Sequence, residues 1–256
     1  MADVLVLCYH AVSPNWPAPL SVTPEAFERQ LKLLVDRGYR GATFREAVSP
    51  ERSERTMAVT FDDAYLSVLE LAKPIMDRLG LVGTVFVPTD YPERDAPMAW
   101  PGIDHWMGGP HEAELRPMNW EQLRRLTEEG WEIGSHTCSH PHLTELDIDS
   151  LDRELIVSRT ECERHIGRPC LTVAYPYGDY NGGVAAAAGR AGYQAACTLP
   201  ARFHEAQPLE WPRVGVYHTD DDRRFRLKVS PTLRRLRASR AWDAIDRVRR
   251  KLRRSS

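Results

Sequence analysis

Strand-like and helix-like segments alternate along most of this chain. The apolar, strand-like runs cover residues 4–8, 57–59, 84–87, 131–135, 171–174, 194–197 and 213–217. Helix signals lie between these runs: Thr23 and Pro24 open a segment that ends at Gly38, and Asn119 precedes Gln122 in a capping-box pattern. Such alternation predicts parallel βαβ units and therefore an α/β fold. With 256 residues, the chain is long enough for a single barrel.

Two of the predicted strands end in side chains suited to catalysis. One strand runs directly into Asp62 and Asp63, and crowded carboxylates repel unless a metal ion or a proton joins them. Another ends at His136, with His140 four residues later, where the two imidazoles lie side by side on a helical turn. Alone, the acids fit a capped turn and the histidines fit packing or capping. Together, after strands whose carboxyl ends share one face of a barrel, they favour a catalytic metal site.

Three motifs resemble those of the polysaccharide deacetylases, the NodB-homology or carbohydrate esterase 4 family. Residues 60–63 read Thr-Phe-Asp-Asp, like the first motif, and residues 136–140 read His-Thr-Cys-Ser-His, like the second. Residues 174–178 read Ala-Tyr-Pro-Tyr-Gly, like the third, which usually begins with arginine. The motifs occur in the family order, and the resemblance spans roughly residues 5–217. It implies a distorted (β/α) barrel with about seven parallel strands.

The resemblance also implies a ligand set and a general base. Asp63, His136 and His140 are expected to hold a divalent metal ion. Zinc is the first expectation, with cobalt, nickel, manganese or iron as alternatives. Asp62, next to the metal ligand, is expected to take the proton of the attacking water. A metal polarises an amide carbonyl and lowers the pKa of a bound water, so these roles are chemically consistent.

The third motif departs from the family pattern at its first position. By resemblance, the backbone N–H of Tyr177 holds the oxyanion, and Pro176 belongs to the same tight turn and to the substrate-binding residues. The usual arginine, which orients the base, is replaced by Ala174. Arg213 on the last strand is the candidate to supply that guanidinium instead. The alternative for Arg213 is a structural surface arginine.

Four further residues are candidates for the pocket. A final family motif supplies a histidine that protonates the leaving amine, and His218 is the only histidine just after a late strand. The alternative for His218 is a surface position. His10 follows the first strand and is either a pocket residue or a packed histidine. Trp100 and Trp106 lie in a long loop, about residues 91–118, where their rings either form a wall for a sugar or pack the loop onto the barrel.

Charge is distributed unevenly along the chain. Residues 223–256 hold 14 Lys or Arg and 2 Asp or Glu, a local charge of +12, whereas the whole chain carries −2. The first 222 residues therefore carry −14. We predict a catalytic domain over residues 1–222 and a basic, helical C-terminal tail over residues 223–256. The acidic body argues against a nucleic-acid partner.

The tail has the pattern of an amphipathic helix. Apolar residues spaced mostly by three or four are Leu233, Leu236, Trp242, Ile245, Val248 and Leu252. Arginines occupy the other faces, which suits peripheral contact with an anionic membrane. The alternatives are a helix packed on the acidic body and a solvated end.

The compartment expected from the sequence is the cytoplasm, with the tail at the inner face of the membrane. The N-terminus lacks the basic and apolar regions of a secretory signal, and no run approaches the ~20 apolar residues of a membrane span. Five cysteines without a Cys-x-x-Cys spacing suggest reduced thiols.

The function expected from these features is a metal-dependent amidohydrolase acting on a non-peptide C–N bond. Its substrate would be an N-acetylated amino-sugar saccharide, either a polysaccharide or a glycan precursor. One alternative is a deformylase or another C–N hydrolase with the same site. A second is a carbohydrate-binding pseudoenzyme, against which the intact Asp62, Asp63, His136 and His140 argue.

Overall fold

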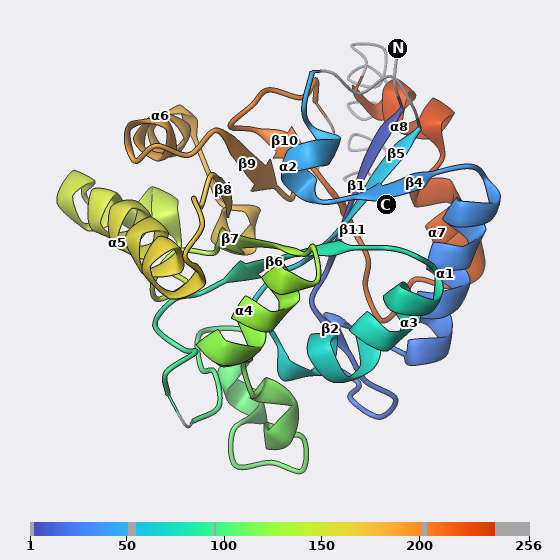
Figure 1. Ribbon diagram of the computed structural model, residues 1–256, viewed down its shortest axis with the longest axis horizontal. Helices are drawn as coiled ribbons and strands as arrows, with labels where there is room; N and C mark the ends of the chain where they lie inside the picture. The colour runs from blue at the N-terminus through green and yellow to red at the C-terminus, as the bar shows by residue number, and fades with distance from the viewer. Residues whose placement is uncertain (1–2, 51–54, 95, 201–203, 239–256) are drawn as a thin grey trace, which may run out of the picture.

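A parallel sheet of nine strands is the framework of the computed structural model, which describes residues 3–50, 55–94, 96–200 and 204–238 (Figure 1). The strands are β1 (Val4–Tyr9), β4 (Arg40–Ala42), β5 (Thr56–Phe61), β6 (Gly83–Val87), β7 (Glu132–Ser135), β8 (Thr172–Ala174), β9 (Ala195–Thr198), β10 (Trp211–Pro212) and β11 (Val214–Gly215). They follow the order β10-β9-β8-β7-β6-β5-β1-β11, with β4 paired to the first half of β5. Two short strands, β2 (Ala11–Val12) and β3 (Ser21–Val22), pair separately.

The two ends of the sheet meet in one short segment, residues 211–215. Its first half, β10, pairs with β9, and its second half, β11, pairs with β1. Arg213 lies between the two halves. If this segment is counted as one strand, it joins β1, β5, β6, β7, β8 and β9 into a nearly closed ring. The predicted distorted barrel with about seven parallel strands is therefore confirmed.

Helices cover the outside of the ring (Figure 1). They are α1 (Pro24–Asp36), α2 (Phe44–Ala47), α3 (Lys73–Arg78), α4 (Trp120–Glu128), α5 (Ile148–Ile166), α6 (Gly182–Arg190), α7 (Asp222–Lys228) and α8 (Pro231–Ala238). The predicted start signals are in place, because Thr23 accepts from the N–H of Ala26 and Asn119 forms a capping box with Gln122. These caps satisfy backbone donors that the first helical turn leaves free.

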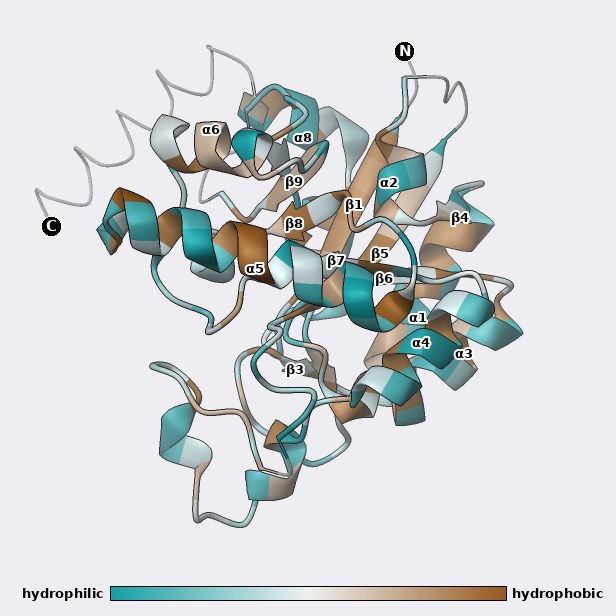
Figure 2. Cartoon of the chain, turned by 60° about the vertical axis from the view of Figure 1, so that its left-hand side comes forward, coloured by the Kyte–Doolittle hydropathy of each residue, from teal (hydrophilic) through white to brown (hydrophobic). Residues whose placement is uncertain are grey.

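The core lies between the strands and the inner faces of the helices. Every residue of β5 and β6 is buried, as expected for parallel strands covered on both faces. On α1, the apolar stripe of Phe27, Leu31 and Leu34 is fully buried. Figure 2 shows apolar strands at the centre and polar residues along the outer helical surfaces. This packing fixes the strand ends, and with them the loops that carry the candidate site.

The first part of the predicted tail packs on the barrel. Phe225 and Val229 belong to the main apolar core, and the guanidinium of Arg234 pairs with Asp3 at 2.7 Å. The stripe residues Trp242, Ile245, Val248 and Leu252 lie outside the described residues, so membrane contact stays a prediction, as does the domain boundary at residue 222. In the described part of the chain, no helix combines the length and apolar character that a membrane span requires.

Gly134 on β7 offers a test of how tightly the barrel is packed. A Cβ at this position would lie 2.6 Å from ring atoms of Phe86 and 2.7 Å from Oγ1 of Thr172. We expect Gly134→Ala to lower the free energy of unfolding by about 1–3 kcal/mol because the core is overpacked. Gly182→Ala is the control, since a Cβ there meets nothing within 4 Å. Equal denaturation midpoints for the two variants would contradict the packing described.

Candidate active site

The candidate residues meet at the carboxyl ends of the strands, in a cavity of about 180 Å³. Asp62 and Asp63 follow β5, His136 follows β7, and Tyr177 follows β8. His10 follows β1 and completes this side of the cavity. Parallel strands bring residues that are far apart in sequence to one edge of the barrel. The three motifs therefore lie around one cavity.

Asp63, His136 and His140 form a compact, buried cluster of metal-binding groups in the cavity. Oδ1 of Asp63 lies 3.4 Å from Nε2 of His136 and 3.4 Å from Nε2 of His140. Two ligands about 2.1 Å from a zinc ion at tetrahedral angles lie about 3.4 Å apart. All three ligand atoms are within 4.8 Å of one another, and all three residues are buried. The spacing therefore suits a cation held between them.

The hydrogen bonds around this cluster also favour a cation. Nδ1–H of His136 donates to the carbonyl oxygen of Ala174 at 2.7 Å, which turns the Nε2 lone pair toward Asp63. Oδ1 of Asp63 is buried and has no hydrogen-bond partner among the described residues. Buried acceptors rarely remain unpaired. A divalent metal ion would satisfy Asp63 and both imidazoles at once, so the residues fit the metal that the sequence motifs imply.

Strained backbone is concentrated in the three motifs. Among the described residues, the non-glycine residues with positive φ are Asp63 (70°), Ala64 (56°), Thr137 (66°), His140 (64°) and Tyr177 (59°). Each follows the end of a strand within or next to a motif. Such conformations cost about 1–3 kcal/mol each and persist only where the surroundings hold them. They redirect the chain sharply, which lets consecutive residues point into one cavity.

Glu154 on α5 holds the loop between the two histidines. Its Oε2 accepts from the N–H groups of Cys138 at 2.7 Å and Ser139 at 3.0 Å. Its Oε1 accepts from the hydroxyl of Ser139 at 2.6 Å. One carboxylate therefore fixes the backbone that connects His136 to His140. Hydrogen bonds to a charged acceptor are stronger than neutral ones, so this anchor stabilises the left-handed residues of the loop.

Arg213 forms a two-pronged ion pair with Asp62. Nη1 lies 2.6 Å from Oδ1 and Nη2 lies 2.7 Å from Oδ2. Nη1 also donates to the hydroxyl of Thr60 at 3.0 Å, and Arg213 is 1% exposed. Burial is the largest single influence and alone would raise the pKa of Asp62, but the charge and hydrogen bonds of Arg213, together with His136 and His10, outweigh it and lower that pKa to about 2. The guanidinium of Arg213 therefore contacts Asp62, as predicted for a residue that replaces the arginine missing at Ala174.

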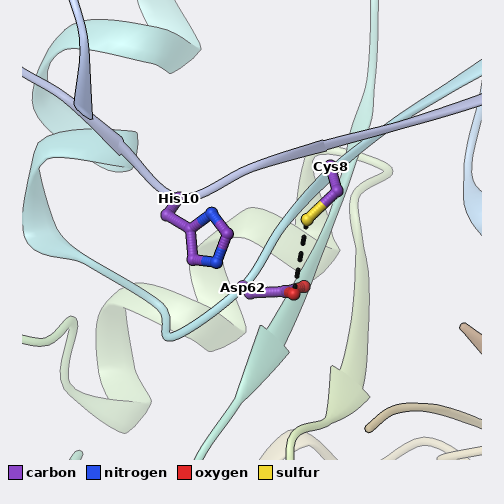
Figure 3. Close-up of side chains that lie close together, drawn as sticks. All are labelled: Cys8, His10 and Asp62. Atoms are coloured by element: carbon purple, nitrogen blue, oxygen red, sulfur yellow. Dashed lines mark hydrogen bonds between the residues drawn. The ribbon is translucent and has the colours of Figure 1, made fainter. Parts of the chain in front are cut away.

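A second group of side chains lies against the other side of Asp62 (Figure 3). The thiol of Cys8 donates to Oδ2 at 3.4 Å, and burial raises the pKa of that thiol well above its usual range. A ring nitrogen of His10 lies within 4.8 Å of both the Cys8 sulfur and an Asp62 oxygen. Nδ1 of His10 is buried without a hydrogen-bond partner in the described part of the chain. Figure 3 shows the His10 ring beside the Asp62 carboxylate.

Aromatic rings form one wall of the cavity. Trp100 stacks on His140 with ring centroids 4.3 Å apart and planes inclined by 22°. The ring of Tyr177 meets His140 edge-on at 4.6 Å, and its hydroxyl donates to the carbonyl oxygen of Pro101. The sequence left two alternatives for Trp100, a cavity wall or a ring that packs the loop onto the barrel. Trp100 does both.

Besides Arg213, which lies behind Asp62, three predicted site residues do not line the cavity. His218 is exposed and does not belong to the cavity lining, and its N–H donates to the carbonyl oxygen of Pro19. Trp106 packs edge-on against Trp16 at 5.8 Å, so it supports the loop instead of forming a sugar wall. Pro176 is buried beneath the turn, whose next residue, Tyr177, faces the cavity.

Other residues at the site were not predicted from the sequence. Glu154 lies 14 positions after His140, and no local pattern marks it as an anchor. Apolar residues that line the cavity beside Trp100 are Leu20, Ile103 and Leu199. These three residues are far apart in sequence, and they come together only because their loops fold over the same strand ends. Cys8 offered a weak signal, since it precedes His10 by two positions on the first strand.

Comparison with known proteins places the three motifs inside a recognised family region. A family model described as polysaccharide deacetylase matches residues 49–196. The protein YxkH of Bacillus subtilis (strain 168), which carries that family name, is 27% identical over 202 residues, covering 77% of this chain and 64% of YxkH. A chitooligosaccharide deacetylase of Bradyrhizobium sp. (strain ANU 289) is 29% identical over 100 residues, covering 38% of this chain and 42% of that protein. The chain thus spans less than two thirds of either relative.

Solved structures share the fold. The deacetylase PplD of Streptococcus pyogenes, solved with acetate, has a TM-score of 0.71 at 22% identity, covering 93% of this chain and 99% of PplD. IcaB of Ammonifex degensii has a TM-score of 0.70 at 20% identity, covering 91% of this chain and 98% of IcaB. These likenesses support the barrel described above.

The Glu154 anchor generates a prediction about the metal site. We expect Glu154→Ala to weaken zinc binding by about 10–100-fold, because outer hydrogen bonds orient metal ligands. Affinity would be measured by competition with a chromogenic chelator. Glu161→Ala on the same helix is the control, since Glu161 pairs with the exposed Arg164. If the two variants bind zinc equally well, Glu154 does not position the ligands.

Proposed function

This chain belongs to the polysaccharide deacetylase family, and on that premise we propose that it is a metal-dependent hydrolase that removes N-acetyl groups from an amino-sugar saccharide. One observation carries the proposal. The Asp63, His136 and His140 cluster shares a small cavity with Asp62, an ionised carboxylate that is not part of that cluster. Hydrolysis of an amide needs both features, an electrophilic centre and a separate base.

In this proposal, Asp63, His136 and His140 hold a divalent metal, with zinc as the expected ion because two imidazoles and one carboxylate suit it. When bound, the metal polarises the amide carbonyl and lowers the pKa of water. The remaining chemistry belongs to the side chains around it. Trp100 keeps the His140 ring in place by stacking on it, and the carbonyl of Ala174 sets the tautomer of His136.

Asp62 acts as the general base. Its low pKa keeps it ionised at neutral pH, and it takes the proton of the attacking water as the new C–O bond forms. Arg213 does not accept this proton, since a guanidinium stays charged in proteins. Its role is to fix both oxygens of Asp62, which lines the cavity. Arg213 is thus a positioning residue.

His10 is the proposed proton donor to the departing amine, in place of the predicted His218. It lines the cavity, and one of its ring nitrogens lies within 4.8 Å of an Asp62 oxygen. As an imidazolium, it gives its proton to the sugar nitrogen while the C–N bond breaks. The oxyanion is assigned to the backbone N–H of Tyr177, whose left-handed conformation at φ 59° lies at the cavity wall.

The acyl group fits the apolar part of the cavity. Leu20, Ile103 and Leu199 lie together with Trp100 in its lining, and a volume of about 180 Å³ suits a short acyl group. The structurally similar PplD was solved with acetate, the product expected of the reaction proposed here. Tyr177 is 39% exposed, so its ring edge is available to a sugar at the mouth of the cavity.

Acetate release from N-acetylated chitooligosaccharides tests the function. We expect the zinc-loaded protein to release acetate and a chelator to stop the reaction until zinc is restored. Asp62→Asn should keep the metal but lose turnover by about 10²-fold or more, as expected for loss of a general base. His136→Ala should lose the metal. Full turnover of His136→Ala without detectable metal would refute the site assignment.

A pair of histidine variants tests the proton donor. His10→Asn should lower kcat by about 10²-fold with its zinc content unchanged, because the leaving amine then departs unprotonated. His218→Asn should keep kcat within about twofold of the parent, since His218 is exposed and away from the cavity. The reverse pattern, with His10→Asn active and His218→Asn inactive, would return the role to His218.

A further inference from the structure

A second cavity, of about 710 Å³, lies at the opposite end of the strands from the active site. Its lining includes Arg37, Arg55, Arg223 and Arg226, which we call the arginine groove. Arg55 directly precedes the six-residue strand β5, whereas Asp62 directly follows it, so the two sites are about 20 Å apart. In Figure 1, α7 and α8 lie beside β1 and α1, away from the loop of residues 91–118.

Three of these arginines lack a carboxylate partner in the described part of the chain. Among the described residues, no carboxylate oxygen lies within 4.0 Å of the guanidinium of Arg37, Arg223 or Arg226. The acid in the groove, Asp222, pairs instead with Arg29 at 3.5 Å. Elsewhere on the surface, arginines commonly pair with acids; these include Arg78 with Glu28 and Arg190 with Asp152. The groove therefore carries a local excess of positive charge on a body whose sequence is acidic.

Contacts with neighbouring residues hold the guanidinium of Arg55 in place, and helix geometry aligns Arg223 with Arg226. Nη1 of Arg55 donates to the carbonyl oxygen of Arg37 at 2.9 Å, and its guanidinium lies over the ring of Tyr39 at 5.6 Å. Tyr39 itself is 5% exposed, so the ring beneath the Arg55 guanidinium is fixed by the packing around it. Arg223 and Arg226 are three residues apart on α7 and so lie on one side of that helix. Cations from three separate segments thus face one cavity.

We propose that the arginine groove binds the phosphoryl group of a phosphorylated ligand. Guanidinium groups match phosphate oxygens in geometry as well as charge, and several together are typical of phosphate recognition. The cavity is within the size range of small-molecule sites, and Leu227 and Pro231 give it an apolar edge. Free organic phosphates and anionic lipid headgroups share this chemistry. Because the groove lies a full strand length from the active site, this ligand is distinct from the acetylated sugar.

Binding of pyrophosphate and of vesicles tests the proposal with one groove variant and one matched control. The groove variant is Arg223→Gln/Arg226→Gln in the full chain. The control is Arg124→Gln/Arg168→Gln, which removes two exposed arginines away from the groove. Pyrophosphate binding is measured by titration calorimetry. Sedimentation is measured with phosphatidylglycerol–phosphatidylcholine vesicles, and pure phosphatidylcholine vesicles are the reference.

We expect the groove variant to bind at least one of the two probes at least about tenfold more weakly than the parent and the control. Loss of pyrophosphate binding alone identifies a soluble phosphate as the ligand, and loss of vesicle binding alone identifies a lipid headgroup. Circular dichroism and acetate release should be unchanged in the groove variant, because both arginines are exposed and remote from Asp62. Equal binding by the groove variant and the control, or no binding of either probe by the parent, overturns the proposal.

Discussion

The buried ion pair between Asp62 and Arg213 connects the closure of the barrel to the chemistry of the site. Arg213 lies between the two short strands that join the ends of the sheet, and both of its terminal nitrogens bind the carboxylate of Asp62. Desolvation makes such a pair a weak source of stability by itself. Removing one partner, however, costs about 3–5 kcal/mol because a buried charge is left uncompensated. The correct closure of the barrel and the ionised state of Asp62 therefore depend on each other.

The active-site loops combine local strain with strong hydrogen bonds. Thr137 and His140 adopt left-handed conformations, and the carboxylate of Glu154 binds the backbone between them. Each strained residue costs about 1–3 kcal/mol, so the loop keeps its shape only because α5 supplies this anchor. The same anchor keeps two imidazoles at the spacing that a metal ion requires. Helix packing on the outside of the barrel thus determines ligand geometry on the inside.

Much of the fold and the centre of the site were predictable from local patterns. Apolar runs and capping signals mark the strands and helices, and parallel strands place Asp62, Asp63, His136 and His140 at one edge. Arg213 became a candidate through the family resemblance, because Ala174 stands where the third motif usually has an arginine. The fold was predictable because each element depends on a short stretch of sequence and the topology of a parallel barrel brings the strand ends together, whereas the roles of the site residues stay predictions.

The remaining features depend on how distant loops fold over the strand ends. His218 follows a late strand, as a catalytic histidine would, but its side chain is exposed and does not line the cavity. Trp100 and Trp106 share one loop, yet only Trp100 reaches His140, because Trp106 packs on Trp16. Glu154 reaches the second motif from a separate helix, α5, and the arginine groove combines α7 with segments that precede β4 and β5. No local pattern encodes these contacts.

A double-mutant cycle on turnover tests the central claim, that Arg213 acts in hydrolysis through Asp62. Acetate release would be compared for the parent, Arg213→Gln, Asp62→Asn and the double variant, with zinc content measured for each. The account predicts that Arg213→Gln loses turnover by about tenfold or more and that the double variant is no slower than Asp62→Asn. Full turnover of Arg213→Gln, or losses that multiply in the double variant, would contradict it.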